Sequence, residues 1–159
     1  MLLAIDPGSE ESAWLLFDAE GIRAFGKEPN AACLERVARL ASAEPVFERA
    51  HACAIEMIAS YGMPVGAEVF ETCVWVGRFM QVFGAGRVSR ITRNAVKHHL
   101  CHSSKAKDAN IRQALIDRYG GKSAIKKGGA LYGIHEDVWA ALAVAVTWWD
   151  REHPDQEPF

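Results

Sequence analysis

Three acidic residues stand where a carboxylate is costly to place, and together they could do metal-dependent chemistry. Asp6 ends a short apolar segment, Glu56 lies inside another, and Asp137 opens a long apolar segment near the C-terminus. Burying an ionised carboxylate costs several kcal/mol unless it is paired or bound to a metal. Carboxylate oxygens are also the ligands that Mg²⁺ and Mn²⁺ prefer. The three residues therefore predict an all-oxygen metal site.

Two of these acids have simpler explanations. Asp6 precedes a Pro-Gly pair and could be a turn residue, and Asp137 could cap its helix. Glu56 serves neither a turn nor a cap, because apolar residues flank it on both sides. The three acids together, with the basic segment 87–127, favour metal-assisted phosphoryl chemistry. In such sites two divalent ions roughly 3.5–4 Å apart activate a water and stabilise the leaving oxygen.

Positive charge is concentrated in one segment of an otherwise acidic chain. Residues 87–127 hold eleven Lys and Arg against two Asp, a net charge of +9, although the whole chain carries −2. The remainder is therefore −11. A basic block in an acidic protein predicts a one-sided surface for a polyanion, with solvated helix faces as the ordinary alternative. We expect a nucleic-acid partner.

The elements that must position the acids follow from the apolar pattern. Strands are predicted at 2–6, 12–17 and 22–26, as an antiparallel meander, and again at 51–57 and 87–91. Helices are predicted at 31–40 with Asn30 as N-cap, at about 66–83, at 92–100, at 108–119 with Asp108 as cap, and at 137–149. The last of these is apolar all round, as expected of a helix buried against a sheet.

This order of elements predicts an α/β layer architecture and a place for the site. If the first and fourth strands are neighbours, Asp6 and Glu56 project side by side near the carboxyl ends of those strands. Ligand sites in open α/β sheets collect at that edge. A third acid from a helix N-terminus, Asp137, would complete the cluster.

The helix predicted at about 66–83 is apolar on more than one face. One continuous stripe, which core packing would explain, contains Val69, Cys73, Val76, Met80 and Phe83. Phe70, Trp75 and Phe79 lie outside that stripe. We therefore expect a dimer contact on this helix.

Length and composition favour one soluble domain. With 159 residues, half of them hydrophobic, the chain suffices for one domain, which we place at 1–151 with a loose tail at 152–159. No apolar run is long enough to span a bilayer, and the N-terminus lacks the basic lead-in of a signal peptide. We expect a cytoplasmic protein with no membrane partner.

Several segments resemble the RuvC-type Holliday-junction resolvases, or crossover junction endodeoxyribonucleases. AIDPGS at 4–9 resembles their first acidic strand, AIE at 54–56 their second, and AALAVAVT at 140–147 their final helix. RNAVK at 93–97 and SSKAK at 103–107 resemble the basic segments between them. The stretch from 55 to 148 looks like the versions carried by bacteriophages and prophages.

The resemblance implies an RNase H-like mixed sheet of five strands flanked by helices, and a homodimer. It also implies Mg²⁺-dependent paired nicks on opposing strands of a four-way junction, with Mn²⁺ as a substitute and two ions per site. Forks and flaps are related branched substrates. Asp6, Glu56 and Asp137 take the catalytic, metal-binding positions of the family.

The chain departs from the family pattern in its last helix. The family has a second acid one turn further on, and Ala140 stands at that position here. Three carboxylates would then have to suffice, or His135 or Glu136 would supply the missing function.

Four basic residues and one aromatic residue match DNA contacts of the family. Lys97 and Lys105 or Lys107, together with Arg93, match segments that handle backbone phosphate, which gives affinity without sequence information. Tyr61 is placed like the aromatic that relatives insert at the junction. Stacking on an unpaired base is worth roughly 1–3 kcal/mol. A loop aromatic that covers the core is an equally simple explanation of Tyr61.

Two other functions remain open. The first is a junction-binding protein with weak or no cleavage, because of Ala140. Substituting Asp6 would distinguish it, since a nuclease loses cutting while a pure binder has no metal-dependent cutting to lose. The second takes the Asp-Pro-Gly-Ser turn as the phosphate loop of an actin-like or sugar-kinase ATPase. Those proteins need two such domains around the nucleotide, and this chain has length for one.

Overall fold

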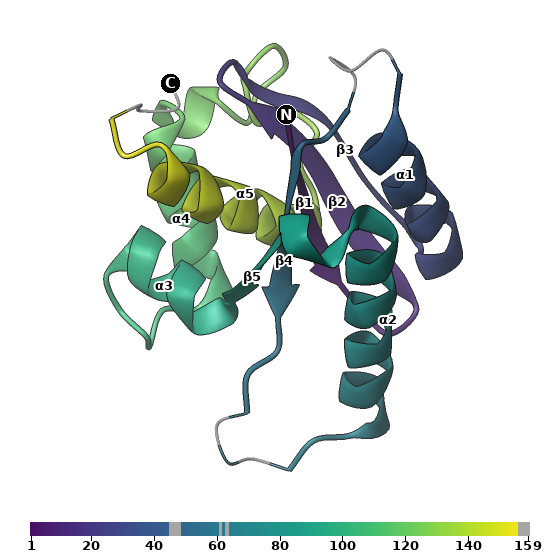
Figure 1. Ribbon diagram of the computed structural model, residues 1–159. Coiled ribbons are helices and arrows are strands. Elements are labelled where there is room, and N and C mark those ends of the chain that lie inside the picture. The colour runs from purple at the N-terminus through teal and green to yellow at the C-terminus, as the bar shows by residue number, and fades with distance from the viewer. Residues whose placement is uncertain (45–48, 61, 63, 156–159) are drawn as a thin grey trace.

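Five strands form one mixed sheet in the computed structural model, which describes residues 1–44, 49–60, 62 and 64–155. They are β1 (Leu2–Pro7), β2 (Glu11–Asp18), β3 (Gly21–Pro29), β4 (Ala52–Met57) and β5 (Val88–Thr92). Their order across the sheet is β3-β2-β1-β4-β5 (Figure 1). The first three strands are the predicted antiparallel meander, and β4 and β5 run parallel to β1.

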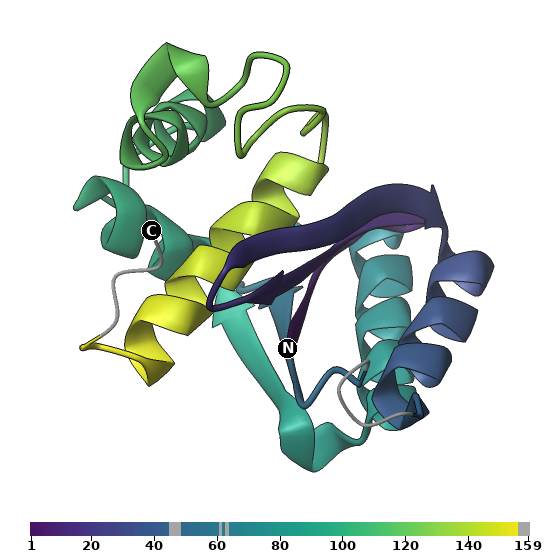
Figure 2. The ribbon, with the colours of Figure 1, turned by 90° about the horizontal axis from the view of Figure 1, so that it is seen from above.

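Helices cover both faces of this sheet (Figures 1 and 2). One face carries α1 (Asn30–Ser42) and α2 (Ala67–Phe83), and α5 (Val138–Glu152) crosses the other. On the α5 side lie α3 (Arg93–Cys101) and α4 (Asp108–Arg118). The short 3₁₀ helices are η2 (Ala85–Arg87) and η3 (Gly121–Ser123). The mixed sheet flanked by helices in a single domain is the predicted α/β class.

The alternation of side chains along the strands decides which residues meet α5. Leu2 and Ala4 of β1 pack with α5, whereas Leu3 and Ile5 pack with α1 and α2. Because successive side chains of a strand point to opposite faces, Asp6 continues the α5 face. Side-chain alternation along β1 therefore points Asp6 toward α5, the helix that begins directly after Asp137.

The last helix is buried all round, as predicted. Every residue from Ala141 to Thr147 is fully buried between the sheet and the α3–α4 pair. The helix begins at Val138, directly after Asp137. Among the described residues, no helix is long and apolar enough to cross a membrane. The predicted domain boundary near 151 stays a prediction, and residues 156–159 of the tail lie outside the described part.

Both predicted caps are wrong. Asn30 is the first residue of α1 rather than its N-cap, and its buried side chain contacts the β1–β2 connection instead. Its Nδ2 donates to the Gly8 carbonyl at 3.0 Å, and its Oδ1 accepts from Ser12 Oγ at 2.6 Å. Asp108 likewise opens α4 without capping it, because its carboxylate accepts from Arg93.

The apolar stripe predicted for the long helix is displaced around its axis. The buried residues of α2 are Thr72, Val76, Phe79 and Phe83. Phe79, which the predicted stripe left out, is therefore in the core, while Phe70 is 62% exposed. The displacement follows from the sheet surface, which meets α2 along the face of Val76 and Phe79.

Candidate active site

Strand register places the first two acids side by side at the carboxyl ends of β1 and β4. Ile5 pairs with Ile55, so Asp6 and Glu56 are the next residues along two parallel neighbours. Asp6 is also opposite Ala13 of β2, which is opposite Lys27 of β3. Residues opposite one another across a sheet share a face. Lys27, Asp6 and Glu56 therefore lie in one row beneath the start of α5.

The β1–β2 connection after Asp6 is held tightly against α1. A Cβ atom at Gly8 would lie 2.4 Å from the carbonyl oxygen of Glu11, so only glycine fits there without a shift. The Asn30 side chain holds this connection through the Gly8 carbonyl and Ser12. Asp6 itself is part of the β1 ladder, opposite Ala13, and is not a turn residue.

Among the three predicted acids, Asp6 has the most strongly raised pKa. Burial, followed by the nearby charges of Glu56 and Asp137, raises the pKa of Asp6 to about 8. Within the described part of the chain, its carboxylate makes no hydrogen bond or ion pair of its own. A half-buried carboxyl beside two other acids favours a cation that binds all of them.

Arg93 joins two acids on the β4 side. Its Nη1 lies 3.1 Å from Glu56 Oε2, and its Nη2 donates to Asp108 Oδ1 at the start of α4. The Glu56 side chain is only 17% exposed. Burial raises the pKa of Glu56 and outweighs the lowering effect of the Arg93 guanidinium. Arg93, predicted to bind DNA, thus lies within the acidic cluster.

Lys27 joins three acids on the α5 side. Its Nζ lies 2.9 Å from Asp137 Oδ2, 3.2 Å from Glu136 Oε2 and 3.6 Å from Glu11 Oε2. Hydrogen bonds to Asp137 and then Glu136 raise the pKa of Lys27. Asp137 occupies the N-cap position of α5, but its side chain makes no cap hydrogen bond and is 56% exposed, so it is not a deeply buried acid. The expectation that all three acids are buried is wrong for Asp137.

The acidic residues outnumber the basic ones at this edge of the sheet. The cluster has six carboxylates against three cationic side chains: Asp6, Glu11, Glu56, Asp108, Glu136 and Asp137, with Lys27, Arg93 and Arg112. An oxygen-rich site with excess negative charge fits Mg²⁺ or Mn²⁺. No three His, Cys, Asp or Glu side chains of the described residues are already grouped to hold an ion. The metal-binding role of these acids stays a prediction.

A basic hollow lies beside the acids. It is lined by Arg93, Asn94, Lys97 and Ser104, and it shares Arg93 with the acidic cluster. Its cationic and hydrogen-bonding side chains suit a phosphate group. Lys105 and Lys107 are exposed on the connection between α3 and α4. Tyr61 lies outside the described residues.

The two predicted accessory residues differ in their surroundings. Glu136 joins the cluster through Lys27, and its backbone φ of 44° is in the left-handed region. His135 is exposed, and its Nδ1 contacts the Gly133 carbonyl of its own loop at 2.8 Å. The structure therefore brings Glu136, and not His135, into contact with the other charged residues. Ala140 lines a small hollow together with Asp108 and Asp137.

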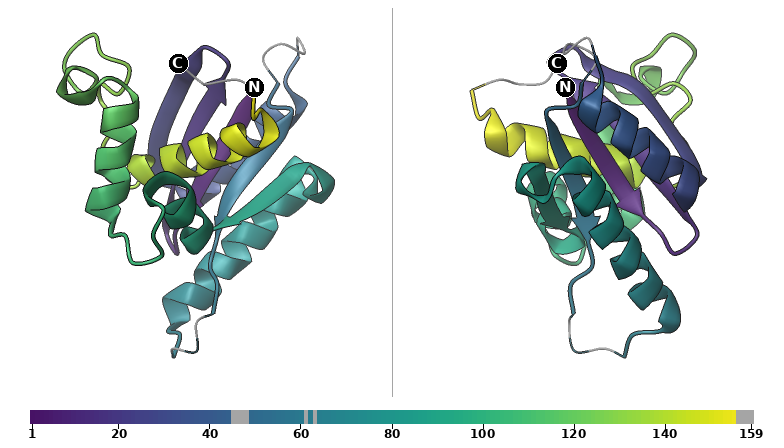
Figure 3. Two further views of the ribbon diagram at one scale, coloured as in Figure 1. Left: turned by 90° about the vertical axis from the view of Figure 1, so that its left-hand side faces the viewer. Right: turned by 45° about the vertical axis from the view of Figure 1, so that its right-hand side comes forward.

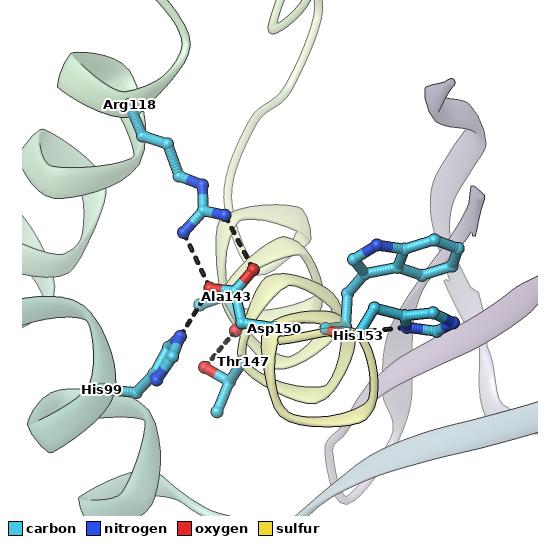
Figure 4. A network of polar contacts seen from close by, with 7 residues as sticks. His99, Arg118, Ala143, Thr147, Asp150 and His153 are labelled. Atoms are coloured by element: carbon cyan, nitrogen blue, oxygen red, sulfur yellow. Dashed lines mark hydrogen bonds and ion pairs between the residues drawn. The ribbon is translucent and has the colours of Figure 1, made fainter. Parts of the chain in front are cut away.

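A polar network fastens the basic helices to the last helix (Figure 4). Asp150 of α5 accepts from both Nη atoms of Arg118 on α4, at 2.7 and 2.8 Å. The same carboxylate lies 2.6 Å from His99 Nε2 on α3. The Asp150 side chain is only 16% exposed. One carboxylate thus links α4 and α3, the helix that lines the basic hollow, to α5.

Sequence reasoning missed Lys27, Glu11 and Asp108 as members of the cluster. The hairpin was an incomplete signal for Lys27, because its turn alone would set Gly26 opposite Ala13, and a register shift between Leu16 and Phe17 puts Lys27 there instead. No comparable signal existed for Asp108, because its place depends on how α4 packs against the sheet.

The fold is shared with two solved structures of bacterial proteins. Thermus thermophilus RuvC has a TM-score of 0.63 to this chain and 19% sequence identity, over 95% of each chain. T. thermophilus RuvC in complex with a Holliday junction substrate has a TM-score of 0.61 and 18% identity, over 92% of this chain and 90% of that one. No protein-family model and no curated protein matches the chain. The protein thus has the RNase H-like fold in its RuvC-like form.

Proposed function

We propose that this protein is a structure-selective endodeoxyribonuclease that resolves four-way junctions and related branched DNA. The observation that carries the proposal is the pair Asp6 and Glu56, side by side in a RuvC-like sheet, next to the basic hollow of Arg93 and Lys97. An acidic cluster beside a basic hollow suits hydrolysis of a phosphodiester. The junction-bound neighbour shows that a protein of this fold accommodates such a substrate.

The proposed enzyme is Mg²⁺-dependent and accepts Mn²⁺. Asp6, Glu56 and Asp137 would hold the metal, which when bound activates a water and stabilises the leaving oxygen. Lys97, with Lys105 and Lys107 on the connection that follows, would contact backbone phosphates. Sequence-independent contacts of this kind suit a protein that recognises branch shape.

We further propose that the protein acts as a homodimer in the cytoplasm. Two copies would set two sites at matching phosphates on opposing strands, as paired nicking requires. The proposed kinship with phage and prophage resolvases rests on the sequence motifs alone.

A junction-binding protein with weak cleavage is the second candidate. Two observations favour it: Ala140 stands at the position of a family acid, and Lys27 and Arg93 already neutralise Asp137 and Glu56. In this case the basic hollow would bind DNA while the acids remain paired within the protein.

A nicking assay decides between the two candidates. The substrates are a synthetic four-way junction, a linear duplex and a splayed arm, each in Mg²⁺, Mn²⁺ or EDTA. We expect paired, metal-dependent cuts near the branch point. Cutting of forks or flaps as readily as junctions would keep the nuclease and remove its junction selectivity. Tight junction binding with no cutting in either metal would establish the binding protein instead.

Glu56→Gln is the matched variant for that assay. It removes one charge from the cluster and leaves the basic hollow intact, so cleavage should be lost while junction affinity changes less than about threefold, under ~1 kcal/mol. Gel-shift titration in Ca²⁺ or EDTA measures the affinity. Full cutting by the Glu56→Gln protein would show that Glu56 has no part in the reaction.

A further inference from the structure

Lys27 is surrounded by carboxylates in the way that a metal ion would be. An ammonium group has three N–H donors. Three acids from separate parts of the chain meet this one: Glu11 at the start of β2, and Glu136 and Asp137 before α5. The two shorter contacts, 2.9 Å to Asp137 and 3.2 Å to Glu136, are hydrogen-bond distances.

The part of the cluster at the ends of β1 and β4 differs, because Asp6 has no cationic partner like Lys27 among the described residues. Asp6 has no hydrogen bond or ion pair in the described part of the chain, and Arg93 contacts only one Glu56 oxygen, Oε2. Lys27 thus supplies the positive charge next to Asp137 and Glu136, whereas Asp6 and Glu56 lack a cation among the described side chains that binds both of them.

A divalent ion on the α5 side would meet two obstacles. It would have to displace Lys27 from Asp137 and Glu136, and it would find a methyl group at position 140. Ala140 lines the same hollow as Asp137 and Asp108. Mg²⁺ gives up its water reluctantly and needs carboxylates that are free to coordinate it, so acids already paired with an ammonium bind it weakly.

We propose that the Lys27 ammonium takes the place of a second divalent ion, so that each protomer binds one ion between Asp6 and Glu56. Lys27 is then a positioning residue, which holds Asp137 and supplies fixed positive charge on the α5 side. This proposal rests on the proposed metal-dependent nuclease, and it replaces both the expectation of two ions and the metal-binding role of Asp137. It also gives the absence of an acid at 140 a physical reason, since an ammonium donates to carboxylates and needs no further oxygen ligand.

Counting bound ions tests the proposal without reference to activity. Isothermal titration calorimetry with Mn²⁺ should give one ion per protomer for the wild-type protein and for Lys27→Arg, which keeps the charge. The double variant Lys27→Met/Ala140→Asp, which removes the ammonium and restores a carboxylate, should bind two. Electron paramagnetic resonance should then show spin coupling between neighbouring Mn²⁺ ions only in the double variant.

The controls separate the role of Lys27 from loss of any positive charge. Lys122→Met removes an exposed lysine of η3 and should leave one ion bound. Ala140→Asp alone should also bind one, because Lys27 still holds Asp137. Circular dichroism tests whether each variant is folded. If the double variant is unfolded, the numbers of Mn²⁺ ions bound by the wild-type and Lys27→Arg proteins test the proposal.

The outcomes distinguish this proposal from the proposed function. Two ions bound by the wild-type protein, or one by a folded double variant, would overturn the role of Lys27 and leave the nuclease intact. No Mn²⁺ binding by the wild-type protein, together with no cutting, would remove the metal-dependent function itself. Cleavage rate against Mn²⁺ concentration should follow a single-site curve in the wild type and a steeper one in the double variant.

Discussion

The position of Asp6, which suits a metal ligand, lowers the stability of the folded chain when no metal is bound. Its carboxyl is half-buried beside Glu56 and near Asp137, and burial is the largest cause of its raised pKa, about 8 against an ordinary 3.8. Between about pH 4 and pH 8 the folded chain holds a proton on Asp6 that the unfolded chain has released. Stability without metal is therefore lost as the pH rises through this window.

The variant Asp6→Asn should be more stable than the wild type in EDTA at pH 8. Asparagine resembles the protonated acid, so the gain should be near zero at pH 4 and should rise up to about pH 8, by at most ~1.4 kcal/mol for each pH unit. Urea denaturation at a series of pH values measures it. Asp117→Asn, at an exposed position on α4, is the control and should change the free energy of unfolding by less than about 0.5 kcal/mol. A gain that does not depend on pH would contradict the explanation.

The residues of the cluster differ in how far the sequence could predict them. Glu56 was the most secure, because a glutamate inside an apolar strand has few explanations other than function. Lys27 is one of many lysines until the hairpin register sets it opposite Ala13, in the row of Asp6. The position of Lys27 next to the acids depends on the register of β1, β2 and β3, and no local sequence pattern around Lys27 predicts it.

At the scale of elements, the sequence predicted the strands and helices well and their ends poorly. Apolar periodicity is a property of a whole segment, so the meander and the buried last helix follow from it. A cap depends on one side chain having no better partner. Asn30 has one in the β1–β2 connection, and Asp108 has one in Arg93. Tertiary contacts therefore override the local preference at both helix starts.

The variant Asp150→Ala should loosen both basic helices at once. It removes the acceptor for Arg118 and His99 from a mostly buried position. Loss of a buried, charge-assisted network costs about 1–3 kcal/mol. We expect a lower melting temperature and weaker junction binding, although no predicted DNA contact is changed. Asp117→Ala, on the exposed surface of α4, is the matched control. Unchanged junction affinity in a destabilised Asp150→Ala protein would show that the network serves stability alone.

At the scale of the whole molecule, α2 lies on the outside of the fold (Figure 3), and apolar residues are among its exposed side chains. Phe70 is 62% exposed and Val74 54%, and they are four residues apart. Residues spaced in this way share one side of a helix. The opposite side, with Val76 and Phe79, is buried against the sheet. A second copy of the chain would cover the exposed stripe.

The double variant Phe70→Glu/Val74→Glu should separate the proposed dimer. Two pairs of like charges would face each other across a twofold axis, which should weaken association at least about a hundredfold, or ~2.7 kcal/mol. Light scattering after size exclusion should show the mass of one chain, and a junction carried on a supercoiled cruciform should receive single, unpaired nicks. Ile125→Glu, an exposed apolar position on the loop after η3, should remain a dimer that nicks in pairs. A monomeric wild-type protein would remove the proposed dimer. A double variant that still nicks in pairs would show that a surface other than α2 coordinates the two cuts.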